Sequence, residues 1–561
     1  MPAADAAGLE EEGRRGPADR PIAAAGALAG TLALAACGGG SDGASGGGTS
    51  TGITVQAAAI TPAQASRFLG QSTMGATRAG VDAVVSRGFE GWIDDQFALA
   101  RATTHWDWLV ANGYNVAANI NSQAGYDATV WRQLIAEPDQ LRQRVGMALL
   151  DFLVVGIDGV NSNWRAFNAA AYLDVLMDGA FDNFRDLLGA ITTNAAMGSF
   201  LTFLNNRKAN AATGSQPDEN YARELMQLFT LGLTKLNMDG TPVGGSAAVE
   251  TYTQADVSGL ARVFTGLSLA GTDTSTPDVY RKPLVMNASI NETGAASFLG
   301  TGVSGGGMAA VNSALDTIFA HANVAPFVSK QLIQRLVSSN PSAAYVARVS
   351  GVFANNGKGV RGDMRAVVKA ILLDSEARSD ASLASTSAGR LREPIARLTS
   401  WARAFGATSP SNAWAIGDTS SPSTRLGQSP GRSQTVFNFF RPGYSPPNTS
   451  LSAAGLVAPE FQVTNEQSVV GYVNYMNTLV TSGTGDVKAD YTAILAKAAD
   501  SAALVDEVNT VLAAGQLSAT TVSSIRAAVD SVATTATNGP ANRVGIAILL
   551  TLASPDYLTV R

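Results

Sequence analysis

Apolar residues recur at helical spacing through most of this chain of 561 residues, whereas alternation with a period of two is scarce. Asp363 stands where an N-cap is expected, and the apolar residues that follow it share one helix face. Thr253 and Asp256 have the spacing of a capping box. Asn340 and Pro341 predict a third helix start, with proline at the first helical position. The sequence therefore predicts a mainly α fold: a large multi-helix body with long irregular loops and at most a small hairpin.

Two long stretches interrupt the helical pattern, residues 266–307 and residues 409–459. Loops of this length are uncommon in compact proteins and are often functional. We expect the main helical domain to cover residues 61–480. Residues 481–561 are rich in alanine and predict further helices of the same body.

The N-terminal region carries the features of a bacterial export signal. Arginines precede an apolar run that ends at Cys37, the only cysteine of the chain, which therefore has no internal disulfide partner. We predict that residues 1–36 are a lipoprotein signal peptide, that Cys37 is lipidated, and that residues 37–60 are a flexible Gly/Ser tether. The protein is then exported and anchored by lipid in the cell envelope, on the periplasmic face or in the outer membrane. The export route, general secretory or twin-arginine, stays open.

Charge and composition argue against several classes of binding partner. Charged residues make up 15% of the chain and the formal net charge is −6, with no basic block beyond the leader. Because phosphate binding needs clustered Lys and Arg, we expect no nucleic acid partner. The chain has two histidines besides its single cysteine, so the sequence predicts no metal site, and it indicates no cofactor.

Two motif matches fail on inspection. Residues 427–431 fit the nucleophile elbow of serine hydrolases, but the elbow needs a backbone N–H after the serine, and Pro430 has none. Residues 300–305 spell a dinucleotide fingerprint, yet no predicted strand precedes them. Neither match supports an assignment of enzyme class.

A dense polar stripe marks residues 218–232. On a helix, the apolar residues of this segment share one side: Tyr221, Leu225, Leu228 and Phe229. Glu219 and Arg223 are four residues apart and can pair. The stripe is either a solvated helix face or the wall of a cleft, and in a charge-poor protein we predict a partly buried cleft. The candidate polar site comprises Glu219, Asn220, Arg223, Glu224, Asp256, Arg262 and His321.

A second candidate site lies in the later irregular stretch. Residues 437–444 contain four aromatics, which either anchor the loop on the core or present a stacking surface for a sugar or peptide. Glu460 and Glu466 add carboxylates nearby, and glycoside hydrolysis requires a carboxylate pair. The candidate loop site comprises Phe437, Asn438, Phe439, Arg441, Tyr444 and Glu466.

The string PDENYARELMQLFTLGL resembles the signature of the bacterial domain of unknown function 1800 family. Five further stretches resemble the same family: residues 67–77, 252–266, 321–341, 391–394 and 426–444. The resemblance extends from about Thr61 to the C-terminus. It implies a large, mostly helical, exported bacterial protein, whose gene neighbour belongs to an exported family, domain of unknown function 1501. It implies no established reaction and no catalytic residues.

The sequence therefore leaves two possible functions, one of a binding protein and one of an enzyme. The first is a non-catalytic envelope lipoprotein that binds or assembles an exported partner. The second is a periplasmic or surface hydrolase that acts on a glycan or peptide through carboxylates. A closed pocket joining the polar residues favours the enzyme, and a broad groove favours binding.

Overall fold

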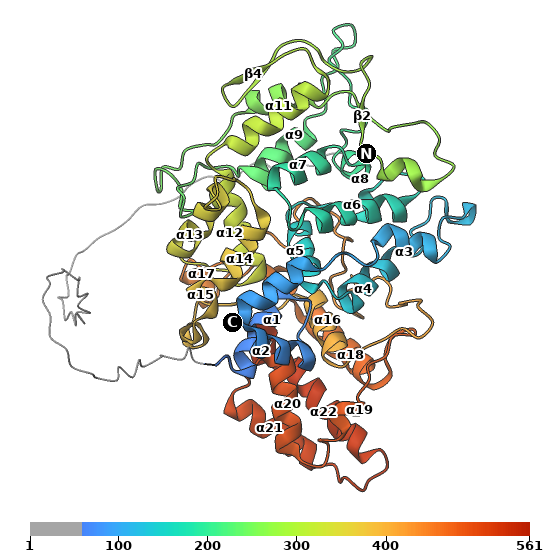
Figure 1. Ribbon diagram of the computed structural model, residues 1–561, viewed down its shortest axis with the longest axis vertical. Helices are drawn as coiled ribbons and strands as arrows, with labels where there is room; N and C mark the ends of the chain where they lie inside the picture. The colour runs from blue at the N-terminus through green and yellow to red at the C-terminus, as the bar shows by residue number, and fades with distance from the viewer. Residues whose placement is uncertain (1–58) are drawn as a thin grey trace, which may run out of the picture. The chain divides into compact units, whose positions relative to one another are not determined.

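Helices dominate residues 59–561, the part of the chain that the computed structural model describes (Figure 1). These residues contain 23 α-helices and form one unit by their internal contacts. The mainly α prediction is confirmed. The predicted signal peptide, Cys37 and nearly all of the tether lie outside the described residues.

The helices of the first half precede the first irregular stretch. They are α1 (Pro62–Ser72), α2 (Arg78–Ala98), α3 (His105–Ala111), α4 (Tyr126–Ala136), α5 (Gln140–Leu150), α6 (Arg165–Gly179), α7 (Phe184–Thr192), α8 (Ala195–Phe200), α9 (Asn220–Glu224) and α10 (Gln254–Val263). Short 3-10 turns are η1 (Ala117–Asn119) and η2 (Ile157–Gly159), and a π-helical turn, η3 (Leu225–Thr230), continues α9.

The second half is helical on both sides of its long loop. Its helices are α11 (Gly307–Ala320), α12 (Val324–Leu336), α13 (Ala343–Ala354), α14 (Met364–Leu373), α15 (Ser375–Arg378), α16 (Pro394–Ala404), α17 (Ser450–Ala453), α18 (Glu466–Ser482), α19 (Thr492–Leu495), α20 (Ser501–Ala513), α21 (Ala519–Asp530), α22 (Gly539–Ala553) and α23 (Pro555–Leu558). Its 3-10 turns are η4 (Pro277–Arg281), η5 (Asp380–Ala384) and η6 (Pro459–Val463).

Strands are few and short within the described residues. They form three antiparallel pairs: β1 (Leu267–Ser268) with β2 (Val285–Met286), β3 (Ala296–Phe298) with β4 (Thr301–Val303), and β5 (Arg390–Leu391) with β6 (Thr559–Val560). The third pair is not a hairpin, because it joins the entry of α16 to the C-terminus, with Arg390 opposite Val560. Sequence patterns predict local hairpins and gave no signal for this long-range pair.

Local capping decides where several helices begin. Asp363 caps α14, where its carboxylate accepts from the backbone N–H of Ala366 at 3.2 Å, and Thr253 caps α10 in a capping box with Asp256, so both predicted starts are confirmed. The predicted start at Asn340 is wrong. Helix α13 begins at Ala343 with Ser342 as its N-cap, because the Ser342 hydroxyl accepts from the backbone N–H of Tyr345, whereas the Asn340 side chain is bonded to a distant loop.

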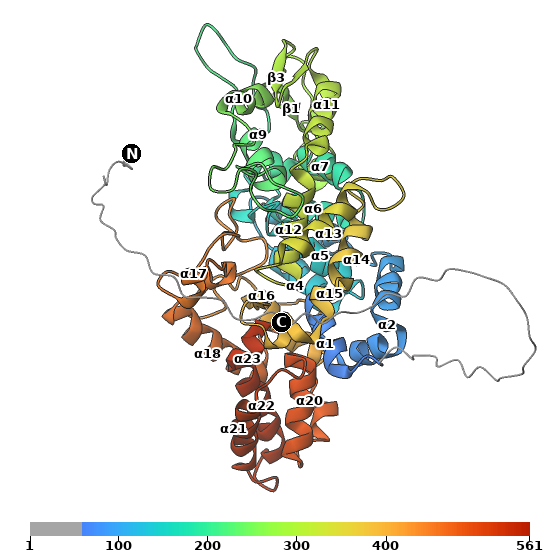
Figure 2. The same cartoon turned by 90° about the vertical axis from the view of Figure 1, so that its left-hand side faces the viewer.

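Helix α12 lies in the middle of the packing. It contacts α13, α5, α14 and η3, while α1 contacts α2, α5 and α20. In both views the C-terminal helices α20–α22 lie together at one end, and α10, α11 and strand β3 lie at the other (Figures 1 and 2). No helix of residues 59–561 combines the length and the apolar character that a membrane crossing requires.

Candidate functional site

The signature segment does not form the single α-helix that its pattern predicts. It starts as α9 and continues as the π-helical turn η3, in which the Thr230 hydroxyl donates to the carbonyl of Leu225 at 2.5 Å. The wider turn changes which side chains share a face, so Leu228 is only half-buried while Phe229 is fully buried. Single π turns are frequent at functional sites, and this one ends beside a hollow described below.

Glu219 holds α9 against α10. Its carboxylate pairs with Arg223 at 3.0 Å, as the spacing predicts, and accepts from Gln254 Nε2 at 2.7 Å and from Ser258 Oγ at 2.5 Å. These bonds, that from Ser258 foremost, lower the pKa of Glu219. The carboxylate is therefore fully engaged in a structural contact between two helices.

Glu224, one helical turn from Asn220, is buried and differs sharply from Glu219. Burial raises the pKa of Glu224, against the opposing charge of Arg223, and its Oε2 has no hydrogen-bond partner among the described residues. Asn220 is half-buried, and its backbone N–H donates to Asp218 at 2.8 Å. The predicted stripe thus contains one engaged carboxylate and one buried carboxyl group.

Asp256 and Arg262 make their polar contacts away from this stripe. Asp256 accepts from the backbone N–H of Thr253 and of Leu299, both at 2.7 Å. Arg262 lies 3.6 Å from Glu292. Both residues therefore serve local structure around α10.

His321 also has its own surroundings. Its Nδ1 accepts from the backbone N–H of Asn323 at 3.1 Å, and its carbonyl accepts from Arg361 at 3.0 Å. Burial, and then Lys235 and Arg361, lower the pKa of His321. The structure thus brings Glu219 and Arg223 together, and places Asp256, Arg262 and His321 in separate contacts.

The candidate loop site is anchored at its centre. Asn438 donates to Asp151 Oδ1 at 2.7 Å, the Arg441 guanidinium lies over the Phe437 ring at 4.6 Å, and Phe440 is buried. The remaining members are half-buried or exposed: Phe439, Tyr444 and Glu466. The Asn438 side chain therefore attaches the loop to the buried residue Asp151.

Beneath this loop lies a buried charge network that the sequence did not reveal. It comprises Arg144, Asp151, Arg335, Arg390, Glu393 and Glu460, each 7% exposed or less. Arg390 donates to Glu460 at 3.0 Å and also to Glu393 and to the carbonyl of Arg335. Arg144 donates to the same carbonyl at 2.5 Å. Glu460 and Glu466 are thus separated, because one is in this network and the other is exposed at the start of α18.

Burial sets the protonation of the network. Desolvation, reinforced by Glu393, raises the pKa of Asp151 to about 8. Desolvation also raises the pKa of Glu460, whereas Arg390 and Arg144 outweigh it at Glu393 and keep that pKa below its ordinary value. Buried charges are tolerated only when they are paired and hydrogen-bonded. The fold therefore depends on the ion pairs and hydrogen bonds of this network.

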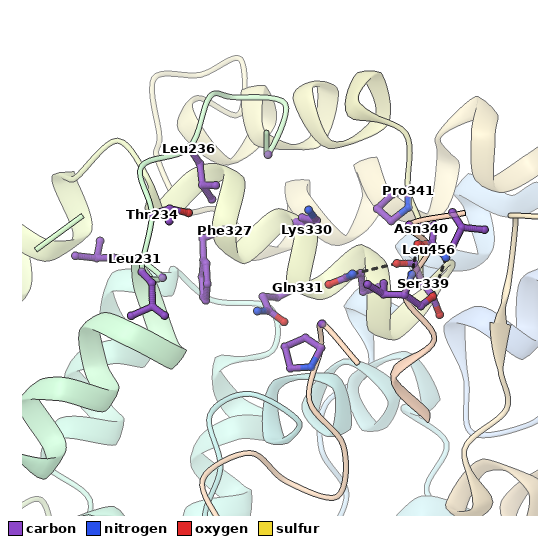
Figure 3. Close-up of a pocket in the computed structure, with 18 of the residues that line it drawn as sticks. Leu231, Thr234, Leu236, Phe327, Lys330, Gln331, Ser339, Asn340, Pro341 and Leu456 are labelled. Atoms are coloured by element: carbon purple, nitrogen blue, oxygen red, sulfur yellow. Dashed lines mark hydrogen bonds between the residues drawn. The ribbon is translucent and has the colours of Figure 1, made fainter. Parts of the chain in front are cut away.

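A hollow of about 590 Å³ lies beside the loop, and we call it the first hollow (Figure 3). Its lining is drawn from the end of the signature segment, from α12, and from two parts of the later irregular stretch. The residues that line it and that Figure 3 labels are Leu231, Thr234, Leu236, Phe327, Lys330, Gln331, Ser339, Asn340, Pro341 and Leu456. Three of the family-like stretches therefore meet here.

Most polar groups of the first hollow are already bonded. Gln334 donates to the carbonyl of Ser339 at 3.0 Å, and Asn340 exchanges two bonds of 2.9 Å with the backbone of Val457. Lys330 is one exception, because it forms no ion pair or hydrogen bond with any described residue. Burial lowers the pKa of Lys330.

A second hollow, of about 670 Å³, shares Asn340 and Ser387 with the first. We call the two adjoining hollows the cleft. Among the residues that line the cleft, Glu376 is the single carboxylate, and it accepts from the backbone N–H of Ser342 at 3.0 Å. Residues 59–561 contain no group of three His, Cys, Asp or Glu side chains placed to hold a metal ion.

Two signals in the sequence point to polar residues outside the two predicted candidate sites. Arg390, Arg392 and Glu393 stand within four positions of a charge-poor chain, immediately before a helix. Lys330 and Gln331 stand between the apolar residues Val328 and Leu332 in the sequence of α12. Both patterns indicate polar side chains in buried surroundings, although neither identifies the residues that these side chains contact.

Comparison with known proteins agrees with the family-like stretches. The family described as "Protein of unknown function (DUF1800)" matches residues 67–559. Because this match covers nearly the whole chain, the protein belongs to the domain of unknown function 1800 family. No curated protein and no solved structure matches the chain.

Proposed function

We propose that this protein is an exported, lipid-anchored cell-envelope protein that binds a segment of an exported partner in the cleft. The cleft is the observation that carries the proposal. Its two hollows adjoin along Asn340 and Ser387, and each has the size of a ligand site. A continuous cleft with both polar and apolar lining suits an extended segment of a polymer.

The chemistry of the lining supports binding over hydrolysis. Glycoside hydrolysis uses two carboxylates that flank the scissile bond. Glu376 alone lines the described cleft, and its contacts with Ser342 engage it. The carboxylates that the sequence offered for catalysis are elsewhere, with Glu460 in the buried charge network.

The partner that we propose is an exported protein of the domain of unknown function 1501 family. Lipid on Cys37 would hold the cleft at the membrane surface, where an exported partner is accessible. Two or more acyl chains anchor a protein stably, whereas one anchors it only marginally. Cys37→Ser should therefore release the protein into the soluble fraction, and a variant that stays on the membrane contradicts the anchor.

Site-specific crosslinking tests the binding role. A photo-crosslinking amino acid at Leu456, in the cleft, should capture one exported protein in intact cells. The same amino acid at Val285, a strand residue that is 47% exposed and does not line the cleft, should not capture it. Equal capture at both positions, or none at Leu456, overturns the proposal.

A further inference from the structure

The first hollow holds hydrogen-bond donors that have no acceptor. Neither Lys330 nor the side-chain amide nitrogen of Gln331 donates to a described residue, and the Gln331 oxygen accepts from Arg335. Ser339 is 4% exposed, and its hydroxyl has no partner among the described residues. Lys330 and Gln331, which are half-buried, can therefore donate to an acceptor on a ligand.

These donors belong to one side of the hollow. Lys330 and Gln334 are one helical turn apart on α12, and the Gln334 amide contacts Ser339. Figure 3 shows Lys330 and Gln331 next to each other on this helix, with Ser339 beyond its end. A ligand that lies along α12 can therefore meet Lys330 and Gln331, whereas the buried Ser339 hydroxyl is not exposed to the hollow.

The charge of the first hollow indicates a ligand that carries one negative charge. No carboxylate of the described residues lines the first hollow, and Asp239, the acid whose charge reaches Lys330, is bonded to Thr241 at 2.9 Å and 2.6 Å. A single half-buried ammonium balances a single charge. A phosphate would bring a second charge with no cation to meet it, and multiply charged groups are better matched by arginine forks.

The walls beside Lys330 are apolar. They consist of Leu231, Leu236, Phe327 and Leu456. A chain end places a carboxylate and an apolar side chain on the same α-carbon. An internal Asp or Glu instead brings backbone on both sides, whose N–H and C=O groups need partners of their own.

We propose that the first hollow binds the C-terminal carboxylate of a peptide that ends in an apolar residue. The carboxylate accepts from Lys330 and Gln331, and the terminal side chain packs on Phe327 and its apolar neighbours. This inference rests on the proposed function, because the chain end would belong to the exported partner. Capture of terminal carboxylates in preformed sites is an established mode of peptide recognition.

Fluorescent hexapeptides that end in Ala-Leu test this proposal with the detergent-purified full chain. The peptide with a free C-terminus should bind about tenfold more tightly than its amide, which corresponds to about 1.4 kcal/mol for one charged contact. Lys330→Met should remove this preference. Lys358→Met, at an exposed lysine that does not line the cleft, should leave it unchanged.

Further peptides separate the alternatives. An amidated peptide with an internal Glu that binds as well as the free acid overturns the chain-end assignment, and a terminal phosphate that binds more tightly overturns the carboxylate. Equal binding of acid and amide, or no binding of any peptide, overturns the inference as a whole. If crosslinking at Leu456 persists in that case, the binding role stands without the carboxylate site. If crosslinking is also lost, both fail.

Discussion

Asn438 donates a hydrogen bond of 2.7 Å to Oδ1 of Asp151, and this bond fastens the aromatic loop to the buried charge network. Asp151 is the C-cap of α5, and the same loop continues to Pro442 and Gly443, which line the first hollow. One wall of the cleft is therefore attached to a group of buried charges. The protonation of that group should influence the stability of the fold around the cleft.

Asp151→Asn should change how stability depends on pH. The folded pKa of Asp151, about 8, lies above the ordinary value of about 3.9, so the folded state keeps a proton that the unfolded state releases. The stability that this proton contributes is complete below about pH 3.9 and is lost as the pH rises through about 8. The asparagine variant cannot ionise and can still accept from Asn438.

Thermal unfolding of both proteins across this range measures the effect. The melting temperature of the natural protein, relative to Asp151→Asn, should fall as the pH rises from about 4 to about 8. A difference that stays constant would show that Asp151 ionises at an ordinary pKa.

Arg390→Met should destabilise the protein by about 3–5 kcal/mol, because it leaves buried carboxylates without their cation. Arg390 contacts both Glu393 and Glu460, and both are buried. Urea unfolding measures the loss. The double variant Arg390→Met with Glu460→Gln should recover part of it, since one of the stranded charges is then absent.

Arg87→Gln is the matched control for this loss. Arg87 pairs with Asp95 at 2.7 Å, but their side chains are 57% and 52% exposed. An exposed ion pair contributes little to the free energy of unfolding, so this variant should unfold at the same urea concentration as the natural protein. Equal losses at Arg87 and Arg390 would contradict the special role of the buried network.

The sequence predicted those parts of the fold that local chemistry determines. Asp363 and Thr253 cap helices where the pattern places them, because a cap needs only the side chain and the next turn. Asn340 has the same local appearance. Its side chain instead binds Val457, 117 residues later, and Ser342 takes the cap. Nothing within one turn of Asn340 carries that information.

In the candidate sites, too, local contacts could be predicted from the sequence, whereas contacts between distant residues could not. The pair of Glu219 and Arg223 is local and was predicted correctly. The first hollow unites Leu231, Lys330 and Leu456, which only the folded chain brings together. The π-helical turn at Leu225 also depends on tertiary packing, since the sequence of the segment is that of an ordinary helix.

Glu219→Gln and Glu224→Gln should respond to pH in opposite directions. The pKa of Glu219 is lowered in the folded state, so its contribution is present above about pH 4.3 and is lost as the pH falls. The pKa of Glu224 is raised, so its contribution is present below about pH 4.3 and is lost as the pH rises. Melting temperatures at acidic and neutral pH test both. At neutral pH, Glu219→Gln should lower the melting temperature and Glu224→Gln should preserve or raise it; the same sign for both would contradict this assignment.

Gly75→Ala should destabilise the protein by about 1–3 kcal/mol, through overpacking against backbone that cannot move aside. A Cβ at Gly75 would lie 2.5 Å from Cα of Ser400 and 3.2 Å from the carbonyl oxygen of Thr399, both in α16, and φ there is +149°. Gly70, in α1, has no atom within 4 Å of the same added group, so Gly70→Ala should stabilise the helix by about 0.5–1 kcal/mol. Urea unfolding of the two variants compares one substitution at two positions five residues apart. Gly75→Ala as stable as the natural protein would mean that the connection between α1 and α2 does not approach α16 as closely as described.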